Sequence, residues 1–360
     1  VSNVTNRFLP QLPLPLVQIV LGISLGFILP QEKFHLDTEL FLALVIGPLL
    51  FREAEESNIT SILKHWRIVL YLIFPVIFIS TVGLGYLAHL LWGALPLAAC
   101  VAVGAALGPT DLVAFASLSE RFSFPKRVEN ILKGEGLLND ASGLVAFRVA
   151  LLAWITGSFS LGKASISLVL SIIGGFAAGM ASAALNRWLH KLLMSAQVSD
   201  IASELLLELS LPLVTFFLAE EIHVSGIIAV VVAGIFKASR FKRITLLEAQ
   251  VDSVTETIWN TVNFMLNGSV FIILGMELEM ISEPILKSPI YDNLLLLVSI
   301  VLLTFLLFAL RFVMLFTFYF IRIRRLHKNV GNYLKEMLLL TFSGVKGTVS
   351  IATILLIPSQ

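Results

Sequence analysis

Residues 128–156 read VENILKGEGLLNDASGLVAFRVALLAWIT, and this stretch decides the fold class. It is long enough to cross a bilayer as a helix, which takes about 20 mostly apolar residues. It nevertheless holds Glu135, Asn139 and Asp140 near its middle. Glu135 and Asn139 are four residues apart and share one helix face, and Asp140 lies beside them. Since polar groups are costly inside a membrane and usually functional, the stretch predicts a membrane helix with a functional polar stripe.

The composition of the whole chain agrees with a membrane protein. Of the 360 residues, 57% are hydrophobic and only 14% are charged, whereas about a quarter of the residues of a soluble domain are charged. The net charge of +1 gives no reason to expect nucleic-acid binding. The single cysteine, Cys100, excludes an internal disulfide and a thiolate zinc site. We expect a segment of a longer protein, because the chain starts with Val1 and ends at Gln360 just after an apolar run.

Eleven apolar segments are candidates for membrane helices. They lie at residues 14–30, 38–51, 68–92, 94–118, 128–156, 164–189, 200–219, 224–238, 254–278, 292–321 and 332–357. The connecting loops alternate in charge: five of them hold sixteen Lys and Arg residues, and the other five hold three. Positive residues favour the cytoplasmic side, so this alternation supports the number of spans and places the first residue inside. The spans are too long and too apolar for barrel strands. We therefore predict an all-α polytopic protein of the plasma (inner) membrane.

A helix break is predicted in the fourth span, at Gly108-Pro109-Thr110-Asp111. Proline has no N–H to donate and clashes with the preceding turn. Such a break frees carbonyl oxygens, which are natural cation ligands in transporters. Asp111 adds a carboxylate at that position. The alternative is a simple proline kink with an acid that faces water.

Positive side chains also occur within the spans. Lys346 lies about 15 residues inside the last span and needs a counter-ion, for which Glu135 and Asp111 are the available acids. The alternative is a lysine that reaches the membrane surface. Arg148 and Arg311 each either pair with an acid or face a water-filled funnel, and the sequence does not distinguish the two.

Together these motifs resemble the monovalent cation:proton antiporter superfamily, in its bacterial sodium/proton exchanger branch. Their order and spacing carry the resemblance. The matching segments are Pro13–Val17 with Leu21-Gly22 and Leu25-Gly26, Gly47–Phe51, Thr110-Asp111, Glu135 with Asn139-Asp140, Ala219-Glu220 with His223 and Ser225-Gly226, Phe264–Gly268 with Phe271 and Leu274-Gly275, and Gly344–Gly347. The departures from the family pattern are Arg52, Leu112, Gly136 and Lys346.

The resemblance implies inverted repeats with two crossed broken helices, in a protein that works as a homodimer in the lipid bilayer. It implies dimer-scaffold helices at residues 1–63 and 199–283. The core transport bundle would comprise residues 64–156 and 284–360, with a linking helix at 157–198.

The resemblance also implies secondary antiport of Na⁺ for H⁺, electroneutral and by alternating access, with no cofactor and no enzymatic activity. Cation and proton would compete for Asp140. Thr110, Asp111, Glu135 and Asn139 would complete the site, with Asp140 and Thr110 as the ligands of transported Na⁺.

The resemblance further places Lys346 where a family arginine pairs with the signature glutamate, here Glu135. Two alternatives stay open for the function. One is an exchanger selective for K⁺ or Li⁺, and the other, from a different class, is an ion channel or a cation sensor.

Overall fold

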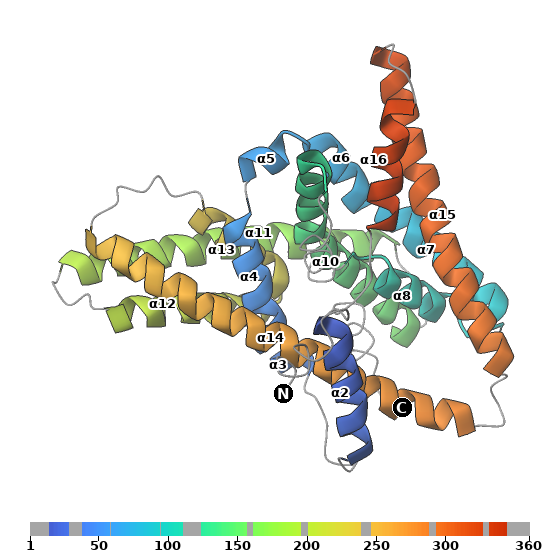
Figure 1. Cartoon of the computed structure of the whole chain (residues 1–360), viewed down its shortest axis with the longest axis horizontal. Coiled ribbons are helices and arrows are strands. Elements are labelled where there is room, and N and C mark those ends of the chain that lie inside the picture. Colours follow the sequence, from blue (N-terminus) through green and yellow to red (C-terminus); the bar gives the residue numbers. More distant parts are fainter. Residues whose placement is uncertain are drawn as a thin grey trace. The chain divides into compact units, whose positions relative to one another are not determined.

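The elements that the computed structural model describes are all helical, and no strand occurs among the described residues (Figure 1). The described residues are 14–28, 38–57, 59–93, 95–110, 124–156, 161–195, 201–238, 246–287, 293–326 and 331–343. The predicted all-α class is confirmed.

Most of the helices overlap the predicted spans, and the one at Leu246–Lys287 extends beyond its predicted span, 254–278, at both ends. They are α2 (Leu14–Ile28), α3 (Thr38–Phe41), η2 (Leu42–Ile46), α4 (Gly47–Glu56), α5 (Ile59–Leu63), α6 (Trp66–Tyr71), η3 (Leu72–Val76), α7 (Ile77–Leu91), α8 (Leu97–Leu107), α10 (Lys126–Thr156), α11 (Leu161–Ser195), α12 (Ile201–Glu221), α13 (Gly226–Ala238), α14 (Leu246–Lys287), α15 (Asn293–Leu326) and α16 (Gly331–Phe342). The two η elements are π-helical turns within longer helices. Pro75 lies inside η3, where the wider turn accommodates a residue that lacks an N–H.

Several helices have the length and composition of membrane spans. Among the described residues, five segments qualify: Trp66–Leu91, Val169–Ser195, Ile201–Glu221, Ser253–Leu278 and Leu297–Ile321. Three shorter apolar helices accompany them: Leu14–Ile28, Leu97–Leu107 and Gly226–Ala238. Together they describe a multi-pass membrane protein.

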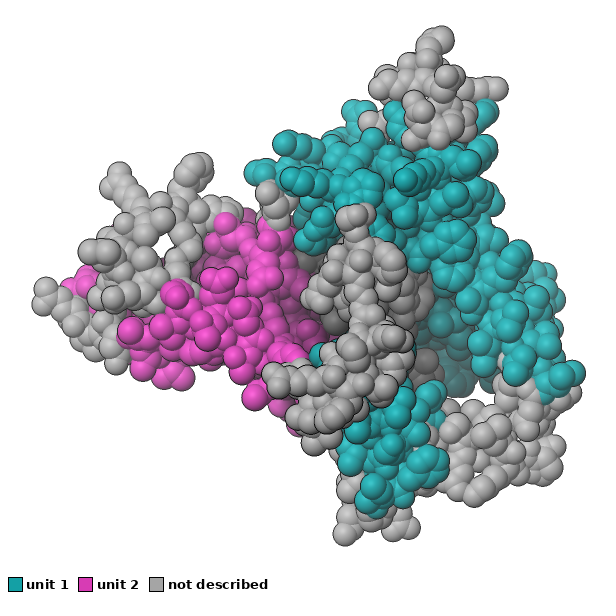
Figure 2. Space-filling model, in the orientation of Figure 1, with its two compact units in different colours: residues 1–34, 60–160, 271–360 teal, residues 35–59, 161–270 magenta. Residues whose placement is uncertain are grey.

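The chain divides into two compact units, coloured separately in Figure 2. Unit 1 contains residues 1–34, 60–160 and 271–360, and unit 2 contains residues 35–59 and 161–270. Helix α14 contributes its first part to unit 2 and its last part to unit 1.

Unit 1 is held together by helices whose backbones approach closely at glycines. A Cβ on Gly104 of α8 would lie 2.3 Å from the Thr81 carbonyl oxygen of α7. A Cβ on Gly22 of α2 would lie 2.1 Å from the Ile272 carbonyl oxygen of α14. Because lipid is as apolar as the side chains, membrane helices associate largely through such close van der Waals packing.

Helix α10 lies between two apolar clusters of unit 1. On one side Phe147 and Ala150 pack on three alanines of α8. On the other, Ile131 and Leu132 belong to a cluster with residues of α6, η3, α15 and α16. These contacts fix the position of the polar stripe of α10 relative to α8 and α15.

Unit 2 packs α13 against α4, α11 and α12. A Cβ on Gly234 would lie 2.5 Å from the Phe51 carbonyl oxygen of α4. The connection from α12 to α13 turns at His223, which has a positive φ of 58°. The amide of Gly226 then donates to the Glu220 carboxylate at 3.1 Å, which caps the start of α13.

Candidate functional site

The polar stripe of α10 contains a buried ion pair. The side chain of Glu135 is 1% exposed, and Arg311 of α15 reaches it with both terminal nitrogens. Nη1 donates to Oε1 at 2.6 Å and Nη2 donates to Oε2 at 2.7 Å. The remaining Nε of Arg311 donates to the Leu340 carbonyl of α16 at 3.0 Å. This bidentate geometry neutralises both charges and connects α10, α15 and α16.

Asn139 and Thr110 extend the ion pair into a polar network. Asn139 is 0% exposed, and its Nδ2 donates to Thr110 Oγ1 at 2.8 Å. The Thr110 hydroxyl in turn donates to Glu135 Oε1 at 3.4 Å. Asn139 Oδ1 is buried and has no hydrogen-bond partner within the described part of the chain. Because an unpaired buried acceptor is costly, this oxygen is a candidate ligand for a cation or a donor.

The predicted helix break lies directly beside this network. Helix α8 ends at Leu107, and Gly108, Pro109 and Thr110 are not helical. The amide of Gly108 donates to Ala105 O, only three residues earlier, at 3.2 Å. Pro109 packs on α10 so closely that a Cβ on Gly143 would lie 2.1 Å from Pro109 Cγ. The last carbonyls of a helix lack intrahelical partners, so this end offers oxygen atoms to a cation.

The structure brings together three of the predicted site residues, Thr110, Glu135 and Asn139. Asp140 follows Asn139 in α10, but its side chain lies outside the described residues. Asp111 also lies outside them. Their roles stay predictions.

Lys346 lies outside the described residues as well, so its pairing with Glu135 stays a prediction. The structure shows that Arg311 is a partner of Glu135. From the sequence alone, Arg311 either pairs with an acid or faces a water-filled funnel. The only signal available was its position in an apolar span, where a charge needs a counter-ion.

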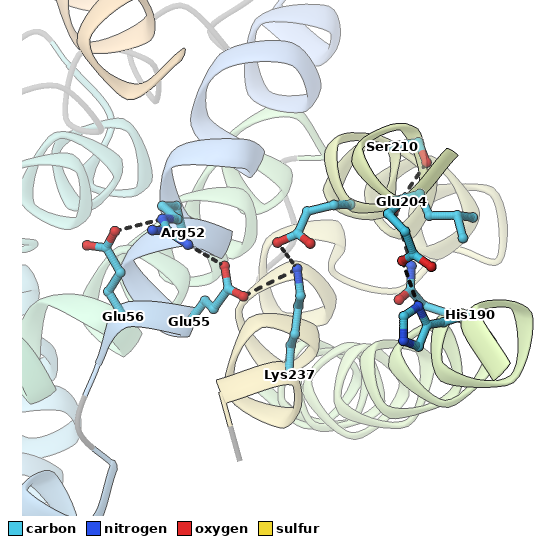
Figure 3. A network of polar contacts seen from close by, with 10 residues as sticks. Arg52, Glu55, Glu56, His190, Glu204, Ser210 and Lys237 are labelled. Carbon is cyan, nitrogen blue, oxygen red and sulfur yellow. Dashed lines mark hydrogen bonds and ion pairs between the residues drawn. The ribbon is translucent and has the colours of Figure 1, made fainter. Parts of the chain in front are cut away.

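Unit 2 holds a second polar network, which joins four helices (Figure 3). Arg52 of α4 pairs with Glu55 at 2.9 Å and with Glu56 at 2.6 Å. Lys237 of α13 pairs with Glu55 at 3.3 Å and with Glu208 of α12.

The same network contains an ion pair between α11 and α12. His190 Nδ1 lies 2.6 Å from Glu204 Oε2. Within the described residues, no group of three His, Cys, Asp or Glu side chains could hold a metal ion. The network therefore has the composition of a structural clamp between helices rather than of a metal centre.

Comparison with known proteins shows the family to which the chain belongs. The sequence profile of the family described as "Sodium/hydrogen exchanger, transmembrane" matches residues 2–360, and the chain belongs to that family. The members named below are antiporters or exchangers, which are transporters and not enzymes.

Three curated relatives are similar over nearly the whole chain. Two are each described as a "Sodium, potassium, lithium and rubidium/H(+) antiporter": one from Bacillus pumilus is 36% identical over 99% of this chain and 54% of its own length, and one from Bacillus subtilis is 37% identical over the same shares. The exchanger YjcE of Escherichia coli is 33% identical, over 99% of this chain and 67% of its own length. The chain thus spans about half the length of the two Bacillus relatives.

One solved structure supports the fold. The sodium proton antiporter MjNhaP1 from Methanocaldococcus jannaschii superposes with a TM-score of 0.69 at 18% identity, covering 98% of this chain and 82% of that one.

Proposed function

We propose that this protein is a secondary antiporter that exchanges Na⁺, or a related monovalent cation, for H⁺ across the membrane. The observation that carries the proposal is the buried network of Glu135, Arg311, Asn139 and Thr110 at the break of α8. The network lies beside Asp140, in a chain of the sodium/hydrogen exchanger family.

The charges of the network support Asp140 as the exchanging group. Arg311 occupies both oxygens of Glu135, so Glu135 is held as a partner in an ion pair. Asp140 is then the acid of α10 that accepts either one proton or one monovalent cation. Both loaded states carry the same charge, which makes the exchange electroneutral. We place Na⁺ between Asp140 and Thr110, with Asp111 and the Asn139 oxygen contributing.

Transport in this proposal proceeds by alternating access and needs no cofactor, because the gradient of one ion drives the other. The core bundle, residues 64–156 and 284–360, moves against scaffold helices at 1–63 and 199–283, with 157–198 as the linking helix. We further propose that the protein works as a homodimer in the plasma membrane.

A second candidate is an exchanger of broader cation selectivity. It is favoured by the Bacillus relatives, whose description includes potassium, lithium and rubidium. Proton flux measured with each cation in turn decides between a Na⁺-selective and a broadly selective protein. A channel would instead give a current that depends on membrane potential, whereas electroneutral exchange gives none.

The test uses the purified chain in proteoliposomes that contain a pH-sensitive dye. Asp140→Asn is expected to abolish cation-dependent proton flux, because an amide neither releases a proton nor balances a cation. Glu129→Gln is the matched control on the same helix, since Glu129 is partly exposed and forms an i,i+4 ion pair with the neighbouring Lys133. Near-normal flux in Asp140→Asn rules out the mechanism.

A further inference from the structure

Thr81, in the second turn of α7, has a buried hydroxyl that the proposed mechanism does not use. The residue is 5% exposed, and its Oγ1 is buried without a hydrogen-bond partner in the described part of the chain. Hydroxyls on other helices of unit 1 donate to the carbonyl four residues earlier. Thr304, Thr317 and Thr341 do so at 2.7, 2.8 and 2.8 Å. Thr81 differs from these three residues, because its buried hydroxyl does not donate to a carbonyl of its own helix and stays unsatisfied among the described residues.

The Thr81 hydroxyl faces the end of α8. A Cβ placed on Gly108, the first residue after α8, would lie 3.6 Å from Thr81 Oγ1. The same two helices touch one turn earlier, where Gly104 abuts the Thr81 carbonyl. The absence of a side chain at Gly104 lets α8 approach the backbone of α7 at Thr81, one turn before the break.

The end of α8 is suited to a cation, and a nearby hydroxyl oxygen can add a ligand to it. The C-terminus of a helix carries a partial negative charge and unpaired carbonyls. Pro109 gives no amide hydrogen to those carbonyls. On the opposite side of the break, two residues further on, Thr110 bonds to Asn139. Oxygen atoms from hydroxyls, carbonyls and amides are the ligands that hard cations prefer.

We propose that Thr81 Oγ1 is a further oxygen ligand for the transported monovalent cation, contributed by α7 at the end of α8. The proposal rests on the proposed antiport and adds a specificity-determining residue to that site. The hydroxyl replaces one water of the cation's hydration shell as the cation reaches the break. Within the described part of the chain no donor or acceptor bonds to it, which leaves it available for that exchange.

The proposal predicts that removal of the Thr81 hydroxyl weakens cation binding without lowering the stability of the protein. Thr81→Val keeps the shape of the side chain and removes the hydroxyl. The KM for the cation is expected to rise about tenfold, as for loss of one hydrogen bond or ligand to a charged group. The melting temperature is expected to stay constant or rise, because the variant no longer buries an unsatisfied polar atom. Thr81→Ser retains the oxygen and is expected to keep KM within about twofold of the wild type.

The experiment measures cation-dependent proton flux against Na⁺, K⁺ and Li⁺ concentration in proteoliposomes, and the melting temperature of each purified variant. Thr304→Val is the control, because its exposed hydroxyl bonds to its own helix at 2.7 Å. Unchanged KM in Thr81→Val overturns the role of Thr81 while leaving the antiport intact. A lower melting temperature in Thr81→Val also overturns it, because the hydroxyl would then be structural. A wild-type protein without cation-dependent proton flux would instead refute the proposed function itself.

Discussion

The buried pair of Glu135 and Arg311 gives the most direct test of the structure. Replacing Arg311 with methionine leaves a carboxylate that is 1% exposed, and its remaining contacts within the described part of the chain are long: 3.4 Å to Thr110 Oγ1 and 3.5 Å to Asn139 Nδ2. Removing one partner of a buried pair costs about 3–5 kcal/mol. The lost bond to Leu340 O adds about 1 kcal/mol. We therefore expect the free energy of unfolding to fall by about 4–6 kcal/mol.

The double variant separates the charge from the packing. Replacing both residues of the pair with apolar side chains of similar volume removes the unpaired charge, and such exchanges are often neutral or stabilising. Arg311→Met with Glu135→Leu is thus expected to recover most of the lost stability, apart from the Leu340 bond. The assay is reversible unfolding of the purified protein in mixed micelles, followed by circular dichroism, for both singles and the double. A double variant whose loss of stability equals the sum of the two single losses would refute the reasoning, because the cycle would then show no coupling.

Two further changes test the packing of each unit. Lys237→Met leaves two partly buried carboxylates, Glu55 and Glu208, without their shared ammonium group. It should lower the free energy of unfolding by about 3 kcal/mol or more. Lys133→Met, at an exposed ion pair, should change that free energy by less than about 1 kcal/mol. Equal losses in the free energy of unfolding, measured by denaturant titration of the two variants, would contradict this expectation. Gly22→Leu should separate α2 from α14 and lower the melting temperature, since even a Cβ there would lie 2.1 Å from a backbone oxygen. Gly93→Ala is its control, because a Cβ at Gly93 meets nothing within 4 Å. Equal melting temperatures for the two variants would show that the close crossing contributes nothing.

Local chemistry was enough to predict the parts of the site that depend on neighbours in sequence. The end of α8 follows from Pro109, which cannot take part in a helical hydrogen bond. The shared face of Glu135 and Asn139 follows from their spacing on one helix. Each of these two predictions required only the residues within about one helical turn of the position concerned.

The partner of Glu135 could not be obtained in that way. Arg311 lies 176 residues further along the chain, and which of several intramembrane cations reaches the acid depends on how α15 packs on α10. The sequence offers Glu135 and Asp111 as acids for Lys346 and does not rank Arg311 against Lys346 as the partner of Glu135. Similarly, α14 and α15 are longer than predicted, with 42 and 34 residues. Apolar residues predict only the part of a helix that lies in lipid. The helix itself is longer, because its backbone hydrogen bonds continue into water.

The distance along the chain between Glu135 and Arg311 has a consequence for biosynthesis. At 5–20 residues per second, a ribosome needs about 10–35 s to add the 176 residues that separate them. During that time α10 carries a carboxylic acid whose counter-ion has not been made. The nascent helix must therefore either enter the bilayer as a neutral acid or stay beside the insertion machinery until α15 emerges. We therefore expect the final release of α10 into lipid to depend on translation as far as α15.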